Sequence, residues 1–182
     1  DRIFVSKFTY GYSKHSFPFS PPIFKKRIFS SKPNYGDLIV FKTPSDNRTD
    51  FIKRLIGLPG DQIQFLNGEL FINNTKIKRT ELQNEITVMC GNEPYDVRGY
   101  NEILPNNNSF VAVYNKVGSM INSDIYEVPE GHYFFLGDNR DCSRDSRFLS
   151  SVGYVHETNL VGKAQIIFFS NDTNKGSVLK FW

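Results

Sequence analysis

Alanine is almost missing from this chain of 182 residues, which has only Ala112 and Ala164. No segment shows the apolar repeat of an amphipathic helix. Phe, Tyr, Ile, Val and Thr are common instead, and aromatic residues make up 15% of the chain. Because these residue types favour strands over helices, we predict an all-β fold with little helix.

Long apolar runs are also missing. No stretch approaches the roughly 18–20 apolar residues of a membrane span, and no signal peptide is visible. The chain begins with Asp1 rather than Met. We therefore expect that it has been cut from a longer protein, with any membrane anchor upstream.

Cysteine and histidine are scarce. Cys90 and Cys142 do not make a disulfide framework, so a single disulfide and two free thiols both stay open. The three histidines, His15, His132 and His156, are scattered along the chain. No glycine-rich phosphate loop appears either, so we expect no metal and no cofactor.

The net charge of +3 is too small to indicate nucleic acid as a partner. The basic residues are concentrated near the start, where residues 1–32 hold seven Lys or Arg against one acid, and eight aromatics fall between Phe4 and Phe29. A basic, aromatic-rich loop at 12–34 suits a membrane surface. A solvated loop with its aromatics folded inward is the alternative.

Strand-like segments dominate the rest of the chain. Asn67-Gly68 between two apolar runs indicates a β-hairpin with a type I′ turn. The strands that we predict most clearly are 3–8, 38–41, 50–56, 63–66, 69–72, 133–136 and 160–169, with weaker candidates at 86–89 and 110–113. We expect a catalytic β core from residues 1–73 and 126–182, with an inserted lobe or long loops at 74–125.

One lysine lies within an apolar strand. Lys53 follows Ile52 and precedes Leu55 by two positions, so folding can draw its amine out of water. Desolvation lowers the pKa of a lysine from about 10.4, and a lysine that acts as a general base needs a pKa of about 7–8. By itself, however, a strand lysine is far more often a surface residue.

The segment 137–147 interleaves three Asp with three Arg. We expect this loop to neutralise its own charges through Arg–carboxylate pairs. A calcium loop is excluded, because the segment lacks the glycine and the terminal glutamate of such loops and carries three arginines. The loop is either a structural ion-pair turn or a rigid support that holds Ser143 and Ser146 beside a catalytic group.

Taken together, these segments resemble the bacterial type I signal peptidase family of Ser/Lys peptidases. The family's lysine box corresponds to Ile52-Lys53-Arg54-Leu55-Ile56-Gly57-Leu58-Pro59-Gly60-Asp61, and its second box is intact as Gly137-Asp138-Asn139-Arg140-Asp141-Cys142-Ser143-Arg144-Asp145-Ser146-Arg147. The resemblance implies a signal-peptidase-like fold of mostly antiparallel sheets, a partial barrel with a small inserted lobe. It covers most of the chain except roughly 12–34 and 74–125.

The resemblance also implies roles. Lys53 would be the general base, and Ser143 would hydrogen-bond its amine and orient it. Around this pair we expect supporting roles for Gly137, Asp138, Asp145, Ser146 and Arg147, with an ion pair between Asp145 and Arg147. Substrate binding is expected at Ile3, Val40, Asp50, Phe51 and Ile52, which would accept an extended peptide with small side chains.

The implied activity is removal of signal peptides from exported preproteins after small-x-small motifs such as Ala-x-Ala. The enzyme would be a monomer on the bacterial cytoplasmic membrane, with its catalytic domain on the periplasmic side, in contact with preprotein signal peptides and the membrane surface.

The family's nucleophilic serine has no counterpart in this chain. It would lie shortly upstream of Asp1, so we expect the polypeptide as given to be inactive. Two alternatives stay open. One is a soluble Ser/Lys regulator that cleaves itself, and the other is a catalytically dead module that binds extended peptides.

Overall fold

The computed structural model describes residues 2–10, 31–116 and 120–169, and over these ranges it holds fourteen strands and one short 3-10 helix. The all-β prediction is confirmed. The strands are β1 Arg2–Ser6, β2 Leu38–Lys42, β3 Asp50–Gly57, β4 Gln62–Leu66, β5 Glu69–Ile72, β6 Thr75–Lys76, β7 Lys78–Glu81, β8 Ile86–Cys90, β9 Glu93–Ile103, β10 Ser109–Asn115, β11 Tyr126–Glu127, β12 His132–Leu136, β13 Val155–His156 and β14 Leu160–Phe169. The helix, η2, spans Glu157–Asn159.

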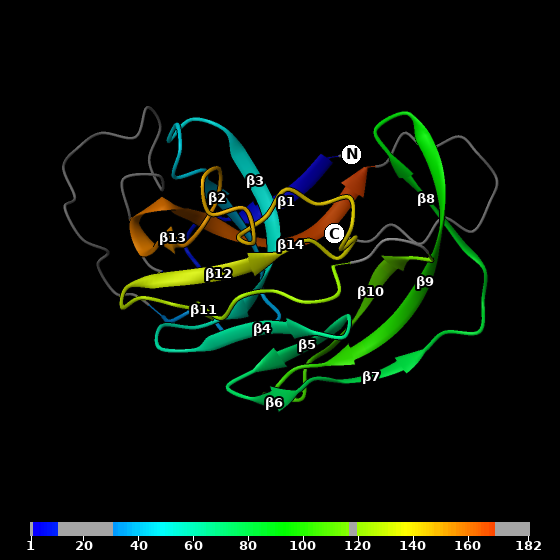
Figure 1. Cartoon of the computed structure of the whole chain (residues 1–182). Coiled ribbons are helices and arrows are strands. Elements are labelled where there is room, and N and C mark those ends of the chain that lie inside the picture. Colours follow the sequence, from blue (N-terminus) through cyan, green and yellow to red (C-terminus); the bar gives the residue numbers. More distant parts are fainter. Residues whose placement is uncertain (1, 11–30, 117–119, 170–182) are drawn as a thin grey trace.

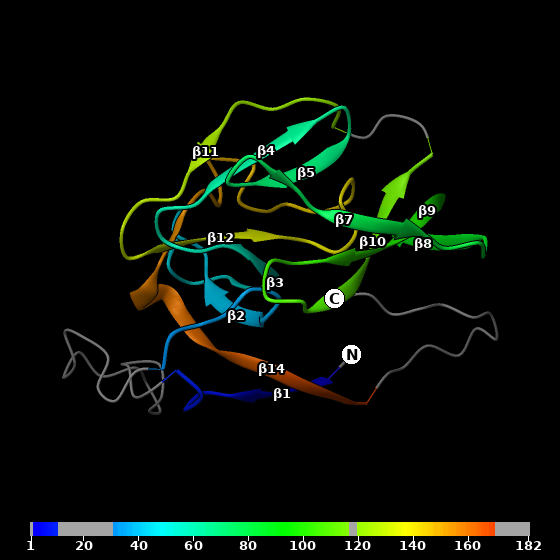
Figure 2. The same cartoon turned by 90° about the horizontal axis from the view of Figure 1, so that it is seen from below.

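The largest sheet brings the two ends of the described chain together. Its six strands run in the order β1-β14-β2-β3-β12-β13, and all neighbours are antiparallel. In Figure 2, β1 and β14 lie at the bottom of the molecule, and β2, β3 and β12 lie above them. The sheet therefore places β3, which carries Lys53, between β2 and β12.

The predicted hairpin forms a second sheet. Strands β4 and β5 pair from Ile63↔Ile72 to Leu66↔Glu69. Asn67 and Gly68 have φ angles of 51° and 74°, the left-handed conformation that a type I′ turn requires. With β11 and β6, these strands form a four-stranded sheet in the order β11-β4-β5-β6.

The segment 74–125 contributes a third sheet. Strands β10, β9 and β7 pair in that order. Strand β8 forms an antiparallel hairpin with the first half of β9. The weak candidates at 86–89 and 110–113 are strands β8 and β10, whereas β7 and the eleven-residue β9 were not foreseen. Figure 1 shows β8 and β9 at the right-hand edge of the molecule.

The core joins the three sheets. One hydrophobic cluster contains Ile56 of β3, Phe65 of β4 and Ala112 of β10, all almost completely buried. A second cluster, with Phe41, Leu55 and others, covers the other face of the six-stranded sheet. The segment 74–125 therefore shares a core with the strands of the predicted catalytic part.

Two predicted regions fall partly outside the description. Residues 12–30 of the basic segment at 12–34 lie outside the described residues, and so do residues 170–182 of the predicted core. In the part of the chain that the structure describes, no helix has the length and apolar character needed to cross a bilayer.

Candidate active site

Lys53 lies in the middle of β3, at a point where the strand has a neighbour on one side. Its register partner on β2 is Ile39. On the other side, β12 pairs with β3 only from Arg54 to Gly57. The alternation of a strand puts Lys53 on the same face as Phe51 and Leu55, and its amine lies 5.6 Å from the centre of the Phe51 ring.

The Lys53 amine meets a single hydroxyl. Its Nζ donates a hydrogen bond to Ser143 Oγ at 2.9 Å, although 90 positions separate the two residues in the chain. Ser143 is buried, with 8% of its surface exposed. No carboxylate among the described residues forms an ion pair with Lys53.

Burial lowers the pKa of Lys53 below its ordinary value, and the positive charge of Arg147 lowers it further. The negative charges of Asp145 and Asp138 act in the opposite direction, but burial outweighs them. A lysine in this state loses its proton at a lower pH than a solvated lysine. The amine can then accept a proton from a nucleophile.

Gly137 makes room for this pair. It follows β12 directly, and a Cβ atom at this position would overlap both Oγ and Cβ of Ser143. The same Cβ would also lie 3.4 Å from Lys53 Nζ. Any side chain at position 137 would therefore push Ser143 away from the lysine, so a glycine is required by the close approach.

Asp145 and Arg147 hold the loop that carries Ser143. Arg147 donates to both oxygens of Asp145, from Nε at 2.8 Å and from Nη2 at 2.9 Å. Asp145 is completely buried and also accepts a hydrogen bond from the Gly137 backbone at 3.0 Å. The carboxylate thus ties the end of the loop back to its beginning.

Ser146 adds a second tie, to the last strand before the loop. Its backbone N–H donates to the Phe135 carbonyl at 3.0 Å, and its Oγ accepts from the Phe135 N–H at 2.9 Å. Ser146 is completely buried. Ser146 therefore ties the loop to β12, while Asp145 ties it to Gly137.

The expectation that loop 137–147 neutralises itself is wrong for Asp138 and Arg140. Asp145 and Arg147 do pair within the loop. Asp138 instead accepts a bidentate pair from Arg54 of β3, at 2.7 and 2.6 Å, and Arg140 pairs with Glu102 of β9 at 2.7 Å. The physical reason is that Asp138 and Arg140 are buried against neighbouring strands, so their charges meet charges of β3 and β9.

The Arg140 contact was missed altogether from the sequence. Arg140 and Glu102 are each 1% exposed, and Tyr114 of β10 bridges them, with its hydroxyl 2.5 Å from Glu102 Oε1 and 2.5 Å from Arg140 Nη1. Burial alone would lower the pKa of Arg140, but the charge of Glu102 and the Tyr114 hydroxyl raise it above its usual value. The only indication in the sequence was Glu102, an acidic residue within the segment 74–125, which was predicted to form a lobe or long loops.

The expected substrate residues are brought together only in part. Val40 and Ile52 are register partners on β2 and β3, and Asp50 and Phe51 begin β3. Val40 is buried, Phe51 and Ile52 are partly exposed, and Asp50 is exposed. Ile3 belongs to β1, which β14 and β2 separate from β3, and its side chain lies outside what the structure describes.

Two further features of the described ranges concern metal ligands and the cysteines. No group of three or more His, Cys, Asp or Glu side chains there is arranged to hold a metal ion. The two cysteines, whose pairing was left open, form a disulfide between Cys90 and Cys142.

Known proteins are similar to this chain in sequence. The family described as "Signal peptidase, peptidase S26" matches residues 1–169. Signal peptidase I of Rickettsia conorii is 44% identical over 181 residues, covering 93% of this chain and 65% of the relative. Signal peptidase I of Rickettsia akari is 42% identical, covering 96% of this chain and 66% of the relative.

The chain thus spans about two thirds of the length of these relatives. A crystal structure of a signal peptidase I from Enterococcus faecalis is 28% identical, covers 73% of this chain and 97% of its own, and superposes with a TM-score of 0.43. On the extent of the family match and the identity to the rickettsial relatives, the chain belongs to the signal peptidase family, peptidase S26.

Proposed function

We propose that this chain forms the catalytic domain of a serine endopeptidase that removes signal peptides from exported preproteins. The observation that carries the proposal is the partly buried Lys53 amine, hydrogen-bonded to Ser143 at 2.9 Å and without an ion pair among the described residues. Membership of the signal peptidase family supports it.

In this proposal Lys53 is the general base. A neutral amine has two N–H bonds and one lone pair, and the bond to Ser143 Oγ fixes one N–H, which leaves the lone pair to face a nucleophile. The nucleophile is a serine that precedes residue 1 in the full-length protein, and the 182-residue chain alone is inactive. Lys53 takes the serine proton and returns a proton to the leaving amine.

The substrate binds as an added strand. Among the described residues no strand pairs with positions 50–53 of β3 on the side where β12 stops, so their backbone groups can pair with an extended peptide. Phe51 and Ile52 flank this edge and are partly exposed. Together with Val40, they form shallow apolar pockets that accept small side chains, hence cleavage after Ala-x-Ala.

The full-length enzyme is anchored in the bacterial cytoplasmic membrane, with this domain on the periplasmic side, and acts as a monomer. The rickettsial relatives are named signal peptidase I. An enzyme that removes signal peptides meets exported chains at the membrane that these chains cross. The basic, aromatic-rich segment at 12–34 supports contact with anionic lipid.

The test compares full-length proteins on a synthetic peptide with an Ala-x-Ala site. The wild type is expected to cleave, with kcat/KM rising with pH as Lys53 loses its proton. Lys53→Met is expected to lose about 10³-fold or more of this activity, the scale of a lost general base, whereas the exposed Lys76→Met keeps it. Activity retained in Lys53→Met would place the base elsewhere.

The other readings give different outcomes. If the wild type and Lys53→Met both bind the peptide and neither cleaves it, the chain is a binding module. If the full-length protein cleaves only itself and leaves the peptide intact, it is a self-cleaving regulator.

A further inference from the structure

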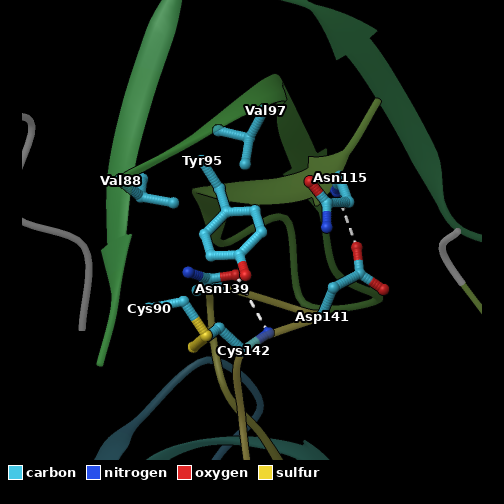
Figure 3. A pocket seen from close by; sticks show the side chains of 8 residues that line it. All are labelled: Val88, Cys90, Tyr95, Val97, Asn115, Asn139, Asp141 and Cys142. Atoms are coloured by element: carbon cyan, nitrogen blue, oxygen red, sulfur yellow. Dashed lines mark hydrogen bonds between the residues drawn. A yellow bond between two sulfur atoms is a disulfide. The ribbon is translucent and has the colours of Figure 1, made fainter. Parts of the chain in front are cut away.

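Two neighbouring residues of loop 137–147 reach two different parts of the fold. Ser143 contacts Lys53 of β3 through its hydroxyl. Cys142, one position earlier, forms a disulfide with Cys90, the last residue of β8, and the Cα atoms of the two cysteines are 5.7 Å apart. Figure 3 shows this bond below the ring of Tyr95, at the wall of a pocket between the loop and β8–β9.

The residues that flank Ser143 on its two sides are held unequally. After it, Asp145 and Ser146 are completely buried and tied to Gly137 and Phe135. Before it, Asp141 accepts a hydrogen bond from the Asn115 backbone at 2.6 Å but is itself exposed. Apart from the disulfide, the Cys142 backbone makes a long hydrogen bond of 3.2 Å to Asn139 Oδ1. The covalent bond is therefore the strongest restraint next to Ser143 on this side.

The position of Ser143 leaves little tolerance. Gly137 closes one side of its site so tightly that a single added carbon would overlap the serine. The Gly137 backbone blocks movement of Ser143 toward it, so a loosened loop carries the serine away from Gly137. Outward movement lengthens the hydrogen bond to the amine and admits water beside it, and water reduces the desolvation that lowers the lysine pKa.

The anchor at the other end of the disulfide is secured in its own sheet. Strand β8 pairs with β9 over five positions, from Ile86↔Val97 to Cys90↔Glu93. Ile86 and Val97 are buried with Val113 of β10 in a small cluster. The backbone of Val113 in turn bonds the loop, donating to the Asp138 carbonyl at 2.8 Å and accepting from the Arg140 N–H at 2.9 Å. β8 is thus a fixed point relative to the start of the loop.

We propose that the Cys90–Cys142 disulfide is a positioning element that holds Ser143 against Lys53, so that the peptidase activity depends on oxidised cysteines. This inference rests on the proposed function, in which Lys53 is the base. Both cysteines are partly exposed, beside a pocket of about 150 Å³ that Tyr95 and Asn115 help to line, so a small dithiol can reach the bond.

Reduction by a dithiol is balanced within the pair of reagents. A thiolate of the dithiol attacks one cysteine sulfur, the S–S bond breaks, and the other cysteine leaves as a thiolate that takes a proton. The second thiol of the reagent then displaces the first cysteine and closes a cyclic disulfide. The protein gains two thiols and the dithiol is oxidised, and the reverse exchange restores the bond.

The experiment uses the full-length protein and records the pH profile of kcat/KM on the Ala-x-Ala peptide. The samples are oxidised wild type, wild type treated with dithiothreitol, Cys90→Ser, and the double variant Cys90→Ser/Cys142→Ser. We expect reduction and both variants to lower kcat/KM near neutral pH about tenfold or more, the scale of a misplaced catalytic group. The rise of activity with pH should also shift to higher pH in all three.

Two comparisons separate positioning from general loosening. Ile72→Ala removes packing at β5, in a sheet that does not carry the disulfide, so it should lower the melting temperature without moving the pH profile. Dithiothreitol should change nothing in the double variant, and reoxidation should restore the wild type.

The two proposals fail in different ways. If Lys53→Met stays active, the base is misassigned whatever the cysteines do. If Lys53→Met is dead while the reduced wild type and the double variant keep the profile of the oxidised wild type, the positioning role of the disulfide is refuted alone. A mass measurement that finds two free thiols in the purified protein would overturn it as well.

Discussion

Two cations, Arg140 within loop 137–147 and Lys53 beside it on β3, differ in their surroundings. Arg140 is 1% exposed and is paired with Glu102 at 2.7 Å, with the Tyr114 hydroxyl bonded to both. Lys53 has one neutral partner, Ser143, and the nearby carboxylate of Asp145 is engaged by Arg147. The structural cation keeps its charge because a carboxylate compensates it. Burial lowers the pKa of the candidate catalytic cation, and the charges of Asp145 and Asp138 offset this effect only in part.

The largest effect on stability should follow from breaking the compensated pair. Arg140→Met leaves the Glu102 carboxylate buried without its partner, which costs about 3–5 kcal/mol of unfolding free energy. Urea unfolding of the 182-residue chain measures it. In Arg140→Met/Glu102→Leu both charges are gone, so most of the loss should return; a double variant as unstable as the single one would contradict this account of the pair.

A methyl group at Gly137 should disturb the uncompensated site instead. Gly137→Ala overlaps Ser143, so we expect a loss of about 1–3 kcal/mol in unfolding free energy from overpacking. In the full-length protein, peptide cleavage should fall about 100-fold, since the hydroxyl is displaced from Lys53. Adding Ser143→Gly relieves the overlap and should restore stability without restoring activity. Full activity in Gly137→Ala would show that the close approach is not needed.

A smaller change tests the bridge in the compensated pair. Tyr114→Phe removes one hydroxyl that donates to Glu102 and accepts from Arg140. We expect the unfolding free energy to fall by about 1–2 kcal/mol, the scale of a buried hydrogen bond to a charged group. Catalysis should be unchanged, as judged from kcat/KM of the full-length variant. A loss of activity at unchanged stability would mean that the Tyr114 hydroxyl acts on the site.

The smallest expected effect is a dependence of stability on pH. A lysine whose folded pKa is lowered destabilises the fold fully below that pKa, and the cost disappears as pH rises to the unfolded value of about 10.4. The unfolding free energy of wild type minus that of Lys53→Met should therefore rise with pH across this window. Urea unfolding at several pH values measures the difference, and a flat difference would show that Lys53 is not desolvated.

The strands were predictable where local pattern decides them. Asn67-Gly68 fixes the hairpin through two left-handed residues, and β14 was expected with the bounds it has. Strand β9 was missed because its first half is exposed and contains a proline, Pro94, as its second residue, so it shows no alternation of apolar and polar residues.

The candidate site, too, was predictable from the sequence only in part. The apolar strand around Lys53 allowed a lowered pKa, although the pattern by itself favoured a surface lysine. Its contact with Ser143 joins residues 90 positions apart, and only the resemblance to the signal peptidases indicated it. The partners of Asp138 and Arg140 and the Cys90–Cys142 disulfide depend on how the sheets pack. No local pattern in the loop could show that its charges are satisfied from β3 and β9.

The neighbouring cations of β3 also make the fold intolerant of a slipped strand. Lys53 and Arg54 point to opposite faces, and Asp138 grips the guanidinium with two hydrogen bonds. Slippage by one residue in one direction would put the Lys53 amine before Asp138 and Ile52 before Ser143. Slippage in the other direction would put Leu55 before Asp138 and present Ser143 with a guanidinium that never gives up its proton. The Arg54–Asp138 pair thus disfavours a shifted register of β3. A chain that folds with this shift loses the ion pair and the contact between Lys53 and Ser143 together.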